Sequence, residues 1–64
     1  MYTLITFFND DTAKIEYHKN GMLKSQSFVK ANSALVWMMK QGKVWEWFKD
    51  DEGNEIAVWE KKEN

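Results

Sequence analysis

The sequence has no cysteine, no proline and no arginine, and it has one histidine among 64 residues. The chain can therefore be stabilised neither by a disulfide nor by a zinc site built from Cys and His ligands. Its length lies near the lower limit for unaided folding. Its stability has to come from packing. The four Trp, four Phe and two Tyr supply the material, because each buried aromatic removes about 150–250 Å² from water.

Long apolar runs and an excess of one charge are also missing. No segment approaches the roughly 20 apolar residues of a transmembrane helix. The N-terminal residues lack the basic region and small-residue cleavage site of a signal peptide. Nine lysines offset ten acidic residues to a net charge of −1, whereas duplex nucleic acid and anionic membranes attract basic surfaces. We expect a cytoplasmic protein that binds no membrane.

Groups that catalyse reactions or hold cofactors are sparse. His18 is the only imidazole, and the sequence offers no nucleophile to pair with it. The acidic run 50–55 has its glycine in fourth place, whereas a calcium-binding EF-hand loop has it in sixth, so the run predicts a hairpin turn. So short a chain leaves little room for a pocket of about 300–1,000 Å³. We predict no enzyme activity, metal, cofactor or small-molecule substrate.

The first half of the chain predicts three strands. Residues 2–8 are strand formers, and residues 13–19 alternate between apolar and polar. A two-residue turn at Asp10-Asp11 would pair Phe8 with Ala13, which puts Ile5 and Phe7 on the face away from the helix. Asn20-Gly21 predicts a type I′ hairpin. It leads into a polar third strand over 22–28, expected to be short or at an edge.

A helix is predicted over about residues 30–41, because the apolar period there changes to that of a helix. Apolar residues recur at helical spacing from Ala31 onward, and the stripe expected to face the sheet is Ala34, Leu35, Met38 and Met39. Gly42 is positioned as a C-cap glycine. Ser27, Asn32 and Ser33 are alternative N-caps. Trp37 falls off the stripe, so we expect its side chain to be partly exposed.

Two further strands are predicted over 43–49 and 55–61, joined by a type I turn with Gly53 in the left-handed conformation. This register sets Trp47 opposite Ala57 and Trp45 opposite Trp59. The tryptophan side should face the helix, because the opposite side would bury glutamates. Residues 62–64 are expected to form a frayed tail.

The fold class is α+β: one domain, residues 1–64, with an antiparallel sheet of four to five strands and one helix on one face, in the order β-β-β-α-β-β. A helix about 15 Å long cannot cover a sheet about 24 Å wide. Apolar side chains on the other face should then be free to contact a partner. The predicted partner-binding residues are Ile5, Phe7, Trp37, Val44, Glu46, Phe48, Ile56 and Val58.

Two functions fit this pattern. The first is a small non-catalytic protein-binding module, such as a regulatory or inhibitory protein of phage or mobile-element type that acts on a larger protein, or a homodimer formed through the open face of the sheet. The second, less favoured, is single-stranded nucleic-acid binding by exposed tryptophans and nearby lysines. The missing arginine and the net negative charge weigh against it.

Overall fold

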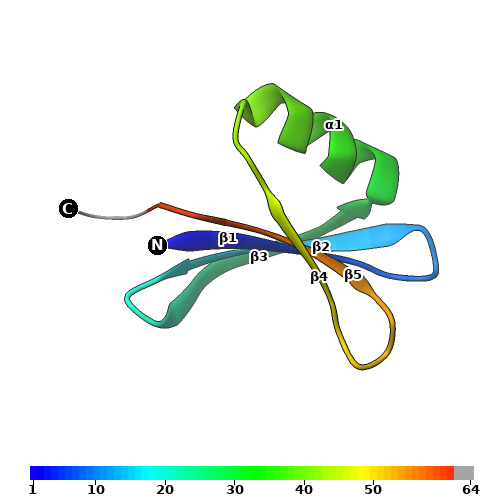
Figure 1. Cartoon of the computed structure of the whole chain (residues 1–64), viewed down its shortest axis with the longest axis horizontal. Coiled ribbons are helices and arrows are strands. Elements are labelled where there is room, and N and C mark those ends of the chain that lie inside the picture. The colour runs from blue at the N-terminus through cyan, green and yellow to red at the C-terminus, as the bar shows by residue number, and fades with distance from the viewer. Residues whose placement is uncertain (62–64) are drawn as a thin grey trace.

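The computed structural model describes residues 1–61 and has a five-stranded antiparallel sheet with one helix on one face (Figure 1). This confirms the predicted fold class and element order. The elements are β1 (Tyr2–Phe7), β2 (Thr12–Lys19), β3 (Met22–Lys30), α1 (Ala31–Gln41), β4 (Glu46–Lys49) and β5 (Glu55–Glu60).

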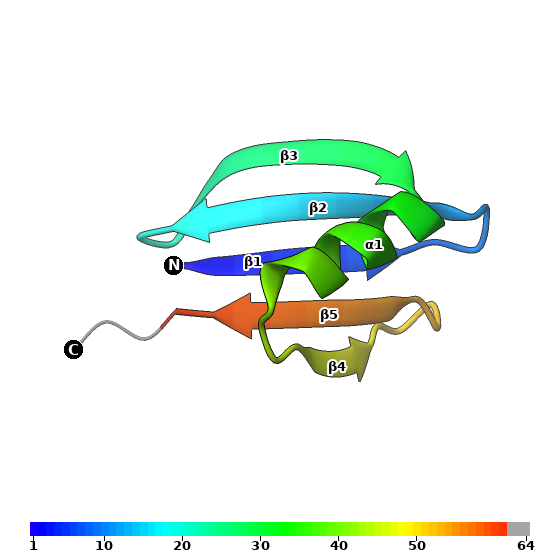
Figure 2. The ribbon, with the colours of Figure 1, turned by 90° about the horizontal axis from the view of Figure 1, so that it is seen from above.

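The strands lie in the order β3-β2-β1-β5-β4, so the first strand of the chain is the centre of the sheet. α1 crosses the sheet diagonally from the end of β3 and carries the chain to the opposite edge (Figure 2). The last hairpin then pairs with β1 through β5. The predicted edge position of β3 is confirmed, and β4 forms the other edge.

The first hairpin differs from the prediction by one residue of register. Phe7, not Phe8, pairs with Ala13. The Phe8 N–H donates to the Thr12 carbonyl oxygen over 2.9 Å, which leaves a loop of residues 9–11. Asp11 takes the left-handed conformation that this loop needs, with φ 67°. A shift of one residue turns every side chain of a strand to the other face, so the predicted outward placement of Ile5 and Phe7 was wrong.

The other two hairpins have the predicted turns. Asn20 and Gly21 both have positive φ, 54° and 74°, as a type I′ turn requires. Gly53 has φ 84°, and Trp47 pairs with Ala57 as expected. β4 begins only at Glu46, so the predicted strand over 43–49 was too long at its start.

The core lies between α1 and the central strands. It consists of five buried side chains, three of them alanines: Ile5, Ala13, Ala34, Met38 and Ala57. Larger side chains, including Phe7 and Trp45, pack around this centre while staying partly exposed. The tryptophan side of the last hairpin faces the helix, as predicted, because the Trp45 ring lies 6.1 Å from the Trp37 ring of α1.

The helix buries a different stripe from the predicted one. Ala34 and Met38 are buried, but Leu35 is 41% exposed and Met39 is 82% exposed. Trp37 packs against the core in their place. The stripe is rotated because α1 follows β3 without a loop. Its N-cap is Lys30, which makes no side-chain capping hydrogen bond, so none of the three predicted caps is used. Gly42 ends the helix in the left-handed conformation, as expected.

Within residues 1–61, the chain has no helix with the length and apolar character needed to cross a membrane. α1, the helix described here, is 11 residues long. The predicted frayed tail at 62–64 lies outside the described residues.

Candidate protein-contact surface

The sheet face that points away from α1, called the open face below, has no described element over it (Figure 1). The strand registers place its residues in rows that cross all five strands. One row runs from edge to edge through Phe28, Lys14, Thr6, Ile56 and Phe48. The next contains Gln26, Glu16, Leu4, Val58 and Glu46. In these two rows β5 contributes two apolar residues, β1, β3 and β4 contribute one each, and β2 contributes none.

Five of the predicted partner-binding residues lie together at the β4–β5 end of this face. Phe48 is 52% exposed and Val44 is 87% exposed, while Ile56 and Val58 are half-buried. A hollow of about 450 Å³ opens beside them, lined by Val44, Glu46, Phe48, Val58, Trp59 and Glu60. Its lining combines apolar side chains with the carboxylates of Glu46 and Glu60, a composition that resembles the apolar centre and polar rim of a protein interface.

The other three predicted residues are not on this surface. Ile5 is fully buried under α1, and Phe7 lies on the same side of the sheet, where its ring stacks on Trp47 at 5.8 Å. Trp37 belongs to α1 and borders a separate hollow of about 380 Å³ on the helix side, together with Val36 and Lys40. Ile5 has no surface for a partner to touch in this fold.

Sequence reasoning missed Leu4 and Phe28 as members of the open face. Leu4 pairs with Val58 and with Glu16 across the centre of the sheet. Phe28, at 64% exposed, lies beside Lys14 at the β3 edge. The signal for Leu4 was present in the Asn9-Asp10-Asp11 run, because an aspartate tolerates the left-handed conformation and so permits a three-residue loop.

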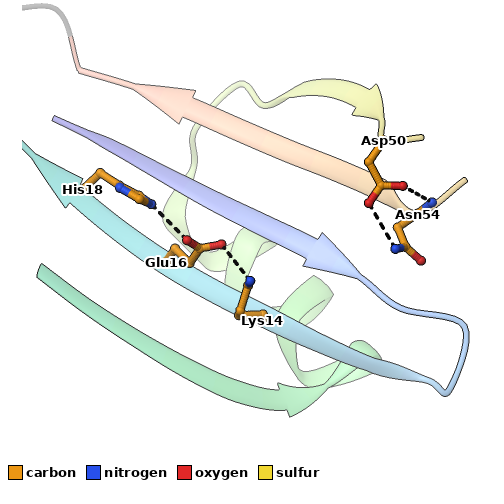
Figure 3. A network of polar contacts seen from close by, with 5 residues as sticks. All are labelled: Lys14, Glu16, His18, Asp50 and Asn54. Carbon is orange, nitrogen blue, oxygen red and sulfur yellow. Dashed lines mark hydrogen bonds and ion pairs between the residues drawn. The ribbon is translucent and has the colours of Figure 1, made fainter. Parts of the chain in front are cut away.

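A small polar network occupies the β2 part of the open face (Figure 3). Glu16 lies between Lys14, whose ammonium is 3.4 Å from one carboxylate oxygen, and His18, whose Nε2 is 3.1 Å from the other. The His18 ring stacks on Tyr2 with centroids 4.5 Å apart. The network ties neighbouring polar side chains together along one strand, and the hydrogen bond of the His18 ring within residues 1–61 is the one to Glu16.

The acidic turn before β5 is built from backbone hydrogen bonds to Asp50 (Figure 3). Partial burial tends to raise the pKa of this carboxyl. The N–H groups of Asn54 at 2.8 Å and Glu52 at 3.0 Å, with the Asn54 amide at 3.1 Å, outweigh it and lower the pKa below 3.8. The carboxylate of Asp50 is thus engaged in holding the turn. Residues 1–61 contain no group of three His, Cys, Asp or Glu side chains placed to hold a metal ion.

Two tryptophans of the β4–β5 hairpin each lie near a lysine: Trp59 near Lys43, and Trp47 near Lys49. The two indoles differ in how much of the ring is exposed. The Lys43 ammonium lies 3.8 Å from the centre of the Trp59 ring, so this ring face is already covered. Trp47 is 49% exposed and borders a shallow hollow of about 340 Å³ with Phe48, Lys49 and Glu55. This hollow is the place in the described chain where an exposed indole and a lysine adjoin.

Comparison with known proteins found no matching family model, no similar curated protein and no similar solved structure.

Proposed function

We propose that this chain is a non-catalytic protein-binding module whose contact surface is the β1–β5–β4 part of the open face. The observation that carries the proposal is the group of exposed apolar side chains around the hollow next to Phe48. Apolar side chains that gather on one surface are typical of protein contacts, whereas scattered ones need no explanation.

The energetics of the surface support this role. Phe48 is 52% exposed, so a partner would cover roughly 100 Å² of its side chain. At roughly 25 cal/mol per Å², this one contact contributes about 2.5 kcal/mol of binding free energy before ordering costs. Val44 and Val58 extend the apolar area, and Glu46 and Glu60 border it with negative charge. The surface therefore fits an apolar patch with a basic border on another protein.

The biological setting is part of the same proposal. A small module with one contact surface suits a regulatory or inhibitory protein that occupies a site on a larger protein. Small phage and mobile-element proteins act in this way, and the comparison with them is by analogy. The balanced charge and the absence of cysteine support action in the cytoplasm.

A charge substitution at the centre of the surface tests the proposal. Phe48→Glu should keep the fold and abolish binding, because it places a buried carboxylate in an apolar contact. Met39→Glu is the matched control, since Met39 is 82% exposed on α1, away from the open face. Tagged wild-type chain and both variants are used to capture partners from the native host, and the captured proteins are identified by mass spectrometry and titrated against purified chain.

The expected result is a protein captured by the wild type and by Met39→Glu but not by folded Phe48→Glu. Equal capture by both variants contradicts the proposal. An unfolded Phe48→Glu chain would assign Phe48 to the core, and Val44→Glu would then test the same surface, because Val44 is 87% exposed.

A single-stranded nucleic acid remains the alternative ligand, and the exposed Trp47 beside Lys49 favours it. Stacking of a base on this indole should quench tryptophan fluorescence at low salt and lose affinity steeply as salt is raised. Trp47→Ala should remove the quenching. Titration with a mixed-sequence oligonucleotide that leaves the fluorescence unchanged at low salt rules this alternative out.

A further inference from the structure

The two edges of the sheet are very different in length. β4 has four residues, whereas β3 has nine, and every side chain of β3 except that of Val29 is exposed. A long edge strand is a template for pairing with another strand, and short edges, bulges and charges are the usual protections. β3 has its bulge and Lys24 near one end, where the register shifts opposite Tyr17 and His18. The stretch from Ser25 to Lys30 is left regular and unprotected by a bulge.

The register shows which backbone groups of β3 point outward. The Ala31 N–H donates to the Asp11 carbonyl oxygen over 2.9 Å, which makes these two residues a hydrogen-bonded pair. In an antiparallel ladder such pairs alternate with pairs whose N–H and C=O groups point away from each other. Lys30, Phe28 and Gln26 are therefore the residues whose backbone groups face away from β2. Lys30 is the N-cap of α1, so its carbonyl oxygen accepts the first hydrogen bond of the helix. The N–H of Lys30 is therefore the backbone group of this residue that is free to pair with another strand.

We propose that β3 pairs with β3 of a second copy of this chain, antiparallel, about a two-fold axis at Phe28. The Phe28 N–H then donates to the carbonyl of the partner's Phe28 and the reverse. The Lys30 N–H donates to the carbonyl of the partner's Gln26, again in both directions. Every outward N–H of Phe28 and Lys30 is satisfied, and the two Phe28 rings form a cross-strand aromatic pair.

The side chains select this axis over its neighbours. An axis at Ser27 would set Lys24 against the partner's Lys30 twice, and like charges directly opposite each other destabilise a pair. An axis at Gln26 would run the regular stretch of one copy into the bulge of the other. With the axis at Phe28, Ser27 lies opposite the partner's Val29, and no two lysines of the strand stand opposite each other. α1 turns back over its own sheet, so it leaves the edge open (Figure 2).

The dimer would be a single continuous sheet, with both helices on one side and both open faces on the other. It does not use the surface around Phe48, so it goes beyond the proposed function and does not depend on it. A strand edge buries less area than a standard interface, and we expect weak association, with a dissociation constant above about 1 μM.

The first experiment measures the oligomeric state by sedimentation up to about 1 mM, a concentration at which even weak pairs associate. Wild type should be a concentration-dependent dimer. Phe28→Glu and Phe28→Lys should each raise the dissociation constant about tenfold or more, because each sets like charges opposite each other at the axis. An equimolar mixture of the two variants should recover dimers. Phe48→Glu, an equal change at an aromatic of similar exposure on the opposite edge, should dimerise like wild type.

The register is read by cross-linking, because the chain has no natural cysteine. A short thiol cross-linker should join Gln26→Cys to Lys30→Cys in a mixture, since these positions lie opposite each other. Gln26→Cys alone should react poorly, because its two copies would be offset by about 13 Å along the strands. A monomeric wild type at 1 mM, dimers lost only in Phe48→Glu, or equal cross-linking by Gln26→Cys alone would each overturn the proposal. Loss of partner binding in Phe48→Glu is a separate readout and reports on the open face.

Discussion

The β1–β2 hairpin and the β4–β5 hairpin have three-residue loops that are closed by the same kind of backbone hydrogen bond but are made from different residues. In one, the Phe8 N–H donates to Thr12 over 2.9 Å; in the other, the Asp50 N–H donates to Asn54 over 3.0 Å. The last loop residue has positive φ in both, 67° for Asp11 and 84° for Gly53. Glycine adopts this conformation without steric cost, whereas an aspartate pays for it. The same register can thus be set by a glycine or, at a cost, by an aspartate.

That loop geometry decides which residues of β1 are core. With Asp11 as the third loop residue, Ile5 points under α1 and is fully buried, and its neighbour Leu4 points to the open face and is half-buried. A two-residue loop would exchange them. The contrast between the two hairpins can be tested at these residues and at the loops themselves.

The largest effect is expected from Ile5→Ala compared with Leu4→Ala. Removing the buried Ile5 side chain should lower the free energy of unfolding by about 2–5 kcal/mol, because it leaves a cavity among alanines that have nothing to fill it. Leu4→Ala should cost clearly less, since water already reaches that side chain. Urea denaturation followed by circular dichroism measures both. If Ile5→Ala unfolds the chain, Ile5→Val supplies the same test, with an expected loss in the free energy of unfolding of about 0.5–1.5 kcal/mol. A larger loss at Leu4 would contradict the observed register.

Exchanging the two positive-φ residues should have a smaller effect. Gly53→Asp should lower the free energy of unfolding by roughly 1 kcal/mol, because it introduces the steric cost of the left-handed conformation. Asp11→Gly should leave the register unchanged and raise stability by up to about 0.5 kcal/mol, the relief being partly offset by the flexibility of glycine in the unfolded chain. Thermal unfolding of the two single variants checks the opposite signs. Equal signs would show that the loops are not equivalent.

The smallest effect concerns the acidic turn and is seen only at low pH. The folded-state pKa of Asp50 lies below its ordinary value of 3.8, because the Asn54 and Glu52 hydrogen bonds outweigh the effect of partial burial. The stabilisation is therefore complete above pH 3.8 and is lost as the pH falls through the lower folded-state value. Asp50→Asn should remove this part of the acid dependence. Asp51→Asn, with the same charge change one residue on, is the control, and identical acid profiles for both variants would contradict the role of Asp50.

The sequence pattern was sufficient for the fold where glycine marked the turns. Asn20-Gly21 and Gly53 identified two hairpins, and Gly42 identified the end of α1, because each supplies positive φ that few residues tolerate. Asp11 supplies the same conformation, but an aspartate indicates positive φ less strongly than a glycine does, and the predicted register of β1 was wrong for that reason. The error exchanged Leu4 and Ile5 between core and surface. The Phe48 side of the contact surface was unaffected, because its register depends on Gly53.

The helix was the other place where local pattern was insufficient. Met39 fits the apolar period, yet it is 82% exposed, whereas Trp37, which falls outside that period, is partly buried against the core. The period of a helix fixes which residues share a side. It does not fix which side turns to the sheet, and here β3 runs into α1 without a loop, so the direction of β3 sets that rotation. This is a constraint of chain connectivity, which the apolar period does not contain.

The contact between Trp37 and Trp45 has an optical consequence. The two indole rings lie 6.1 Å apart and are inclined at 55°, one on the helix and one just before β4. Two identical chromophores at such a spacing and tilt share their electronic excitation, and the coupling produces a pair of circular dichroism bands of opposite sign in the far ultraviolet. The amplitude of this couplet would report directly on docking of the helix against the last hairpin, and Trp37→Phe should abolish it.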